Sequence, residues 1–193
     1  MSQSLAKQSD EKTLFGFWVY IMTDCVLFAS LFATFAVLRF STFGGPGAKE
    51  IFDLQFVFVE TLLLLISSFT CGLAILAARS NDKQKTLTWL AVTFLLGLAF
   101  VGMELFEFNE LISEGYSWQA SAFLSAFFTL VGTHGLHIIV GLVWIVSLGW
   151  LIIKRGLGRH TTRKLMLFSL FWHFLDIVWI FIFTIVYLLG VVL

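Results

Sequence analysis

Three pairs of carboxyl or imidazole side chains are spaced three residues apart within apolar stretches of this sequence. They are Glu104 with Glu107 in MELFEF, His134 with His137 in THGLH, and His173 with Asp176 in WHFLD. Residues three apart lie on one face of a helix, so each pair points as a unit toward a neighbouring helix or a cavity. Carboxylates and imidazoles also ligate the metals of helical di-iron bundles. A metal centre is therefore the first chemistry to weigh.

The composition indicates which solvent surrounds these pairs. Of the 193 residues 59% are hydrophobic, including 23 Phe and 7 Trp, and only 12% are charged, about half the roughly 25% of soluble domains. A soluble chain of this length could not bury so much apolar surface, so we expect an integral membrane protein. The net charge of zero argues against nucleic-acid binding.

A membrane-spanning helix needs about 20 mainly apolar residues, and five stretches qualify. They are residues 14–38, 54–78, 88–108, 123–153 and 165–193. The connections contain FGGPG, SNDKQK and KRGLGRHTTRK, which hold the expected breakers and charges. We therefore expect an all-α fold, a single membrane domain over residues 1–193 built as a bundle of five transmembrane helices.

The orientation follows from the basic residues of the loops, which are in excess on the cytoplasmic side of membrane proteins. Ten Lys and Arg lie on one side, namely Lys7, Lys12, Arg79, Lys83, Lys85, Lys154, Arg155, Arg159, Arg163 and Lys164. Only Arg39 and Lys49 lie on the other. We therefore expect a cytoplasmic N-terminus and a C-terminus on the outer, periplasmic side.

This topology argues against the metal centre. Glu104 and Glu107 would end the third helix at its outer edge, whereas His173 and Asp176 would lie in the inner half of the fifth. The Glu-x-x-His motif of four-helix di-iron proteins does not occur in the sequence. Interhelical hydrogen bonding explains the same residues, because membrane helices associate through small residues and polar contacts.

We accordingly expect a buried polar cluster and no catalytic, cofactor-binding or metal-binding residue. The expected cluster consists of Glu60, His134, His137, His173 and Asp176. Within it, Glu60 and His134 should form a buried pair between the second and fourth helices. Glu107, one residue from its expected helix end, should reach interfacial water, and Asp24 needs a partner that the sequence does not identify.

Five motifs resemble subunit III of the haem-copper terminal oxidases, over nearly all of the chain after Leu14. They are FGFWVYIMTDCVLF (15–28), ETLLLLISS (60–68), GMELFEF (102–108), VGTHGLHIIVG (131–141) and LFWHFLDIVWIF (170–181). Each is weak alone, but all five occur in the family's order and on the corresponding helices. Five helices, an inside N-terminus and the GGPG loop are most similar to the bacterial quinol oxidases, above all the cytochrome o ubiquinol oxidase. A menaquinol-oxidising relative is nearly as similar, for example around SSFTCG (67–72), so the electron donor stays open.

The resemblance implies a non-catalytic subunit of a complex in the bacterial inner membrane that oxidises quinol, reduces oxygen to water and pumps protons. The haems and copper belong to the catalytic subunit I, and this chain would hold no cofactor. Its implied roles are assembly, phospholipid binding in a cleft between the first two helices and the rest, and sustained proton uptake. The resemblance also implies that Glu60 and His134 are neighbours. Arg39, at the outer end of the first helix, is a candidate contact for a lipid head group.

Two other functions remain open at the level of sequence. One is a self-contained membrane oxidoreductase with its own metal, which metal analysis of the isolated chain would reveal. The other is a free-standing proton channel through Glu60 and the histidines, which proton flux in liposomes would reveal.

Overall fold

The computed structural model describes residues 2–45 and 47–192, with side chains described from residue 11 onward; Pro46 and Leu193, which the expected loop and last helix included, lie outside the described residues. The elements are α1 (Ser2–Leu38), α2 (Ala48–Ile51), α3 (Leu54–Arg79), α4 (Lys83–Ser113), α5 (Ala122–Arg155), α6 (Arg159–Ile182), the π-helix η1 (Phe183–Leu188) and α7 (Leu189–Val192). Five helical segments of the described chain are long and apolar enough to cross a membrane. The all-α fold with five spans is thus confirmed.

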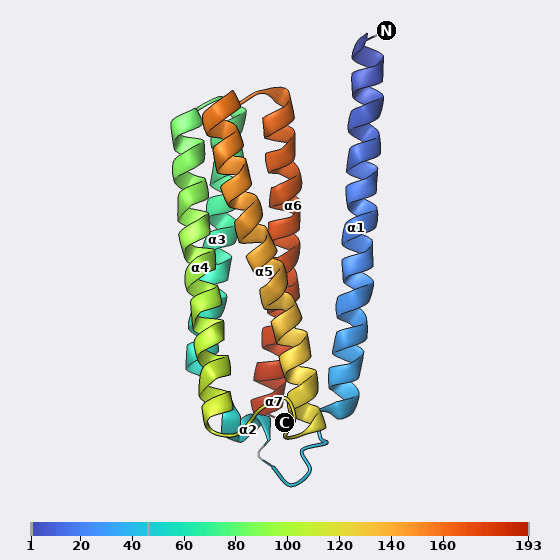
Figure 1. Ribbon diagram of the computed structural model, residues 1–193, viewed down its shortest axis with the longest axis vertical. Helices are drawn as coiled ribbons and strands as arrows, with labels where there is room; N and C mark the ends of the chain where they lie inside the picture. The colour runs from blue at the N-terminus through green and yellow to red at the C-terminus, as the bar shows by residue number, and fades with distance from the viewer. Residues whose placement is uncertain (1, 46, 193) are drawn as a thin grey trace.

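Four of the long helices form a bundle in which each packs against two others. α3 packs against α4 and α6, and α5 packs against the same two helices from the opposite corner. Figure 1 shows these four helices side by side and nearly parallel to the long axis of the molecule. Because α3 and α5 occupy opposite corners, their inward side chains face each other across the centre of the bundle.

The helix α1 stands beside this bundle and contacts only part of it. Ile21, Asp24, Phe28 and Phe35 are its buried positions, and their spacing of three, four and seven residues forms one stripe that faces α5 and α6. Residues 11–20 are almost all exposed, and in Figure 1 this half of α1 stands apart from the bundle. The expectation of a cleft between the first two spans and the last three is therefore wrong, because the second span, α3, packs closely on α4 and α6.

Several helices are longer than their apolar stretches. α4 begins at Lys83 and ends at Ser113 rather than at 88 and 108, and α6 begins at Arg159 rather than at 165. Hydropathy detects only the apolar part of a helix, whereas capping residues determine where it begins. Asp82 caps α4 by accepting a hydrogen bond from the backbone N–H of Lys85 at 3.0 Å, and Ser121 caps α5 in the same way at Leu124.

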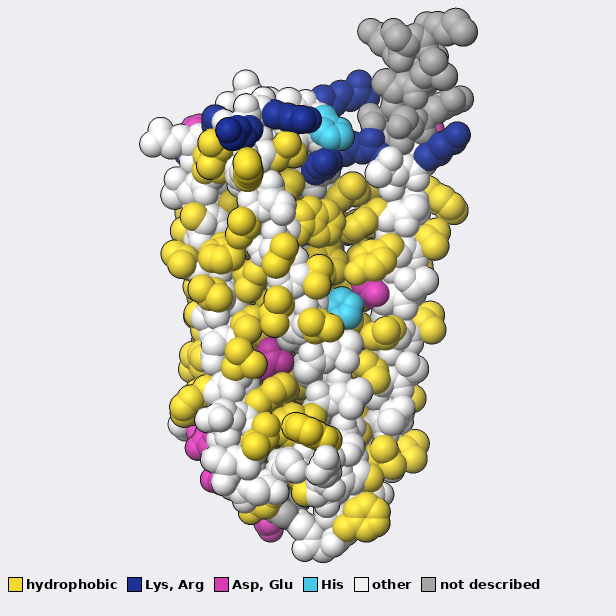
Figure 2. All heavy atoms as spheres, in the orientation of Figure 1, with side chains coloured by type: hydrophobic (Ala, Val, Ile, Leu, Met, Phe, Trp, Pro, Cys, Tyr) yellow, Lys and Arg dark blue, Asp and Glu magenta, His cyan; other side chains and the backbone are white. Residues whose placement is uncertain are grey.

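The two ends of the bundle differ in charge. Lys and Arg side chains gather at the end formed by the α3–α4 and α5–α6 loops, which is the top of Figure 2. We call this end the basic end; its residues are Arg79, Lys83, Lys85, Lys154, Arg155, Arg159, Arg163 and Lys164. The opposite end carries the acidic side chains Glu50, Asp53, Glu110 and Glu114 together with Arg39 and Lys49.

Candidate functional site: the polar groups buried in the bundle

Three carboxyl groups lie inside the half of the bundle farther from the basic end. Glu60 of α3 is fully buried, and Glu104 and Glu107 of α4 are 4% and 8% exposed. Glu60 lies within electrostatic range of both α4 carboxyls. Isolated charges at such depth cost several kcal/mol in hydrocarbon. Among the described residues, both oxygens of Glu60 and Oε1 of Glu104 have no hydrogen-bond donor.

Glu107 obtains its donor from the π-helix. Tyr187 Oη donates to Glu107 Oε2 at 2.9 Å, and the tyrosine is itself completely buried. The expectation that Glu107 reaches interfacial water is therefore wrong, because α4 continues for another six residues and places this carboxyl inside the bundle. A π-helix has an i→i+5 pattern that shifts the side chains after it around the helix axis, and η1 holds Tyr187 facing α4.

Glu104 lies directly against the backbone of α5. A Cβ atom at Gly135 would lie 2.5 Å from Glu104 Oε1 and 2.6 Å from Oε2, closer than any real contact. A side chain at position 135 would therefore require the Glu104 carboxyl to move. Glu104 Oε1 has no hydrogen-bond partner in the described part of the chain, so shape rather than pairing defines this contact.

His134, beside Gly135, is enclosed by aromatic rings. Its ring stacks on Trp179 of α6 at 5.2 Å between centroids, and the ring of Phe100 of α4 lies nearly perpendicular to it at 6.0 Å. Among the described residues, neither ring nitrogen of His134 and neither carboxyl oxygen of Glu60 has a hydrogen-bond partner. The two residues are both fully buried, as expected, but they do not form the expected hydrogen-bonded pair. They project from opposite corners of the bundle, and Trp179 donates from Nε1 to Thr61 Oγ1 at 3.0 Å, which links α6 to α3 beside Glu60.

His137, one turn further along α5, faces α1 instead. Its Nε2 lies 3.8 Å from Asp24 Oδ2, and its Nδ1 lies 2.7 Å from the carbonyl oxygen of Thr133. Asp24 is 7% exposed, and His137 is the partner of Asp24 that the sequence could not identify. The contact joins α1 to the bundle through polar groups, between the apolar contacts of Ile21 and Phe28.

His173 and Asp176 lie on a third surface, the seam between α3 and α6. His173 Nδ1 is 2.7 Å from Ser68 Oγ, and one residue away Trp172 Nε1 donates to Ser67 Oγ at 3.0 Å. Asp176 lies within electrostatic range of His173. The five residues of the expected cluster therefore occupy three places: the centre of the bundle, the α1–α5 contact and the α3–α6 seam.

The residues that complete these places were not singled out in the sequence. Trp179 stacks on His134 and donates to Thr61, and Tyr187 donates to Glu107. Gly135 allows Glu104 to approach α5 closely. Of these residues only Gly135 had a signal in the sequence, its position between two histidines. The structure contains no group of three or more His, Cys, Asp or Glu that could hold a metal ion among the residues it describes.

Arg39 lies outside the bundle core, at the end opposite to the basic end. It lines a pocket of about 330 Å³ together with Lys49, Phe35, Phe123 and Leu189. Its guanidinium also lies 4.4 Å above the ring of Phe40, a cation–π arrangement.

The chain matches a known family of membrane proteins over almost its whole length. The family model described as cytochrome c oxidase subunit III matches residues 6–191. This chain belongs to the cytochrome c oxidase subunit III family. The family consists of haem-copper oxidase subunits without redox centres of their own, and the other subunits of an oxidase complex are its partners. Five spans make the chain a multi-pass membrane protein.

Individual members of the family carry different names. The chain is 58% identical to a cytochrome bo(3) ubiquinol oxidase subunit 3 of Pseudomonas aeruginosa, over 96% of this chain and 88% of the relative. It is 50% identical to a cytochrome c oxidase subunit 3 of Bacillus sp. PS3, over 92% and 86%. It is 48% identical to a quinol oxidase subunit 3 of Bacillus subtilis, over 92% and 87%.

Proposed function

We propose that the chain is the non-catalytic subunit III of a proton-pumping respiratory quinol oxidase in a bacterial inner membrane. The observation that carries this proposal is the 58% identity, across almost the whole chain, to a subunit named for ubiquinol oxidation. Haems and copper in the catalytic subunit I would supply the oxygen chemistry. The residues of this chain would hold a rigid bundle against that subunit and support assembly, lipid binding and sustained proton uptake.

The polar groups inside the bundle fit a structural role. Several of them pair locally or pack on aromatic rings, as in the contacts of Tyr187 with Glu107 and of His134 with Trp179. Polar contacts of this kind associate membrane helices and contribute on average under about 1 kcal/mol each. We therefore assign them to holding the helices in register.

The experiment that tests the proposed function is purification of the chain with its native neighbours. We expect haem absorbance in the purified complex, oxygen consumption with ubiquinol, and normal initial turnover that decays faster once this chain is removed. Menaquinol and reduced cytochrome c serve as alternative donors, because the similar Bacillus subunits carry both names. Stoichiometric iron or copper on this polypeptide alone would contradict the proposal, as would immediate loss of all activity in a complex lacking only this chain.

The proposed function includes an orientation, with the basic end in the cytoplasm. A cysteine at Gly158, in the α5–α6 loop, should resist a membrane-impermeant maleimide added to intact cells. A cysteine at Ser117, in the α4–α5 loop at the other end, should react with it. Labelling of position 158 but not of 117 would reverse the orientation.

It also includes a lipid head group at Arg39, in the outer leaflet on this orientation. A guanidinium pairs well with phosphate, and Lys49 lines the same pocket. Arg39→Gln should lower the phospholipid that co-purifies with the complex, whereas Arg155→Gln, at the opposite end, should not. Unchanged phospholipid in Arg39→Gln would rule out this head-group site.

A further inference from the structure

A shallow groove runs along the α3–α6 seam on the outer surface of the bundle. It has a volume of about 330 Å³ and is lined by His173 of α6 and by a stretch of α3, namely Ser68, Phe69, Gly72, Leu73 and Leu76. Phe69 and Leu76 are 68% and 60% exposed, so the helices of this chain do not cover the surface. The polar side chain of His173 therefore lies at a face that lipid or another protein must cover.

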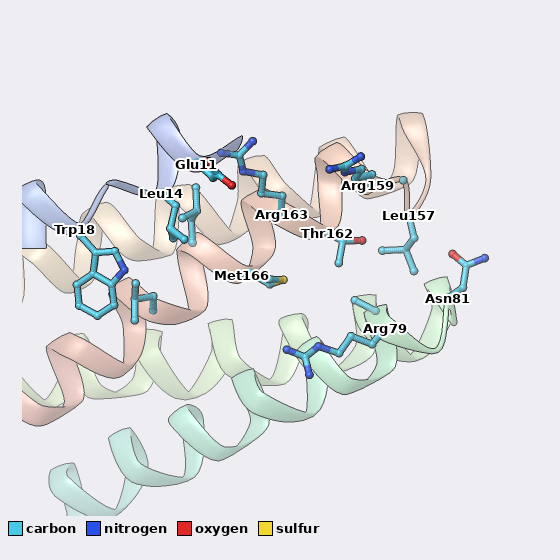
Figure 3. A pocket seen from close by; sticks show the side chains of 14 residues that line it. Glu11, Leu14, Trp18, Arg79, Asn81, Leu157, Arg159, Thr162, Arg163 and Met166 are labelled. Atoms are coloured by element: carbon cyan, nitrogen blue, oxygen red, sulfur yellow. The ribbon is translucent and has the colours of Figure 1, made fainter. Parts of the chain in front are cut away.

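This groove is distinct from the pocket of about 790 Å³ that lies beside α1. Figure 3 shows the side chains of that pocket converging from the start of α1, the end of α3 and the start of α6, close to the basic end. Charged side chains line it, whereas no Lys, Arg, Asp or Glu of the described chain lines the groove at the seam. The two therefore face different parts of the membrane.

The groove lies at the level of the membrane centre. His173 is close to the middle of the span Arg159–Val192, and Ser68 is close to the middle of the span Leu54–Arg79. Lipid head groups lie about 15 Å from this level, so only acyl chains or protein can reach the groove. An ionisable side chain at this depth normally faces a bundle interior or a hydrogen-bonding partner.

His173 has hydrogen-bonding capacity that the chain itself does not use. Its Nδ1 lies 2.7 Å from Ser68 Oγ, but its Nε2 forms no hydrogen bond with a described residue. One turn later on α6, Asp176 Oδ1 is buried and likewise has no hydrogen-bond partner among the described residues. An acyl chain supplies neither a donor nor an acceptor, so lipid alone would leave both groups unsatisfied, which is unfavourable.

Gly72 gives the groove a shape that suits a second helix. A Cβ atom at this position would meet nothing within 4 Å in the chain, so packing inside the bundle does not require glycine here. Glycine in a helix interior is less stable than alanine. Ser68 and Gly72 have the small-xxx-small spacing that lets two membrane helices approach closely. This spacing alone would not define a site, but it adjoins the unsatisfied nitrogen of His173.

We propose that a transmembrane helix of another oxidase subunit docks in this groove and places a hydrogen-bonding side chain against His173 Nε2. Because a membrane helix uses its backbone groups internally, the contact must come from a hydroxyl, amide or carboxyl side chain. The docked helix would lie against Gly72 and cover Phe69 and Leu76. The inference rests on the proposed function, which makes other oxidase subunits the partners of this chain, and it adds the face and the contact by which one of them binds.

Cross-linking in the intact complex identifies the occupant of the groove. A photoreactive benzoylphenylalanine in place of Phe69 should cross-link this chain to a different polypeptide of the complex. Cross-linking to lipid alone, or to a second copy of this chain, in a complex that retains subunit I and haem would overturn the docking surface and leave the proposed function intact. A wild-type preparation without haem would overturn the proposed function, and this inference with it.

A second measurement is the amount of this chain retained on affinity-tagged subunit I after mild detergent extraction, relative to its amount in the membrane. Gly72→Leu fills the groove at a position where a Cβ meets no atom of this chain. It should lower retention about fivefold or more, because overpacking at an interface weakens it. The matched control is Gly102→Leu, at an exposed glycine of α4 whose Cβ would likewise meet nothing within 4 Å, and it should leave retention unchanged. Equal retention of the two variants would overturn the proposal.

Two substitutions of His173 separate its contact with the partner from its contact with Ser68. The amide of His173→Gln reaches the position of Nε2, whereas the shorter amide of His173→Asn lies near the position of Nδ1 and can bond only Ser68. On the proposal, His173→Gln should keep most of the retention on subunit I and His173→Asn should lose it severalfold. A histidine that served only the internal bond to Ser68 would give the opposite order, and that order would overturn the proposal.

Discussion

Tyr187 and Glu107, 80 residues apart in the sequence, form a hydrogen bond of 2.9 Å inside the bundle. The phenol is completely buried and packs on Phe52 and Phe127, with ring centroids 4.7 and 5.8 Å away. The carboxyl therefore receives a donor held in place on several sides. The contact joins the π-helix at the end of the last span to α4, so its loss should lower the stability of the whole bundle.

The first prediction removes this donor. Tyr187→Phe keeps the ring but leaves a buried carboxyl oxygen of Glu107 unsatisfied, which costs about 1–3 kcal/mol. We expect a lower thermal unfolding midpoint of the purified complex. Tyr116→Phe, at a partly buried tyrosine that follows α4, is the matched control and should change the midpoint little. Equal effects of the two variants would mean that the hydrogen bond contributes nothing measurable.

The second prediction concerns the close approach of Glu104 to Gly135. Gly135→Ala places a methyl group 2.5 Å from Glu104 Oε1, and overpacking of this kind costs about 1–3 kcal/mol. Gly149→Ala, on the same helix with nothing within 4 Å of the new methyl, should be neutral or slightly stabilising because alanine favours the helix. The midpoint of thermal unfolding should separate the two.

A double variant checks the cause. If the carboxyl is what the new methyl meets, Glu104→Ala should recover part of the stability that Gly135→Ala loses, since changes at touching residues are not additive. Strictly additive losses would place the clash elsewhere.

Much of the fold follows from the sequence because hydropathy is a local property. The five spans were found at the right places, and their order and motifs also identified the family. The expected helix ends differ from the observed ones by up to twelve residues, as at Ser2 and, by six, at Arg159, because polar residues continue a helix beyond its apolar stretch. The signals for such ends are capping residues such as Asp82 and Ser121, which occur in many non-helical contexts as well.

The contacts between helices could not be derived in the same way. The rotation of each helix about its axis and its register against its neighbours decide whether Glu104 or Glu60 meets the α5 face around Gly135. A single sequence specifies neither the rotation nor the register directly. Burial of Glu60 and His134 was predictable because both lie in apolar runs, but the lack of a hydrogen bond between them was not. The position of Tyr187 depends on a π-helix, for which the sequence FTIVYL gives no visible signal.

The third prediction tests how α1 is held. Asp24→Ala removes the contact with His137 that joins α1 to α5, and a polar contact in a membrane contributes about 0.6 kcal/mol on average. Nitroxide labels at positions 15 and 150, introduced after replacement of both cysteines, should then show a broader distance distribution. Ser30→Ala is the control, because the Ser30 hydroxyl bonds only within α1, to the carbonyl of Leu27. An unchanged distribution in Asp24→Ala would mean that apolar packing alone holds α1.

The last prediction is a pH dependence at the start of α4, in the loop outside the membrane spans. The backbone N–H of Lys85 donates to Asp82 Oδ1 at 3.0 Å, and the Lys85 ammonium lies 3.2 Å from Oδ2. These interactions, the backbone hydrogen bond first, hold the pKa of Asp82 below its ordinary value. A carboxyl whose pKa is lowered by folding stabilises the folded state above its unfolded pKa, about 3.9 for Asp, and that stabilisation is lost as the pH falls through the lower, folded value.

Protection of the first amides of α4 against hydrogen exchange, corrected for intrinsic rates, should therefore fall below about pH 4 in the wild-type chain. Asp82→Asn retains a good N-cap but cannot titrate, so its protection should not change over the same range. A parallel loss of protection in Asp82→Asn would assign the acid sensitivity to another group.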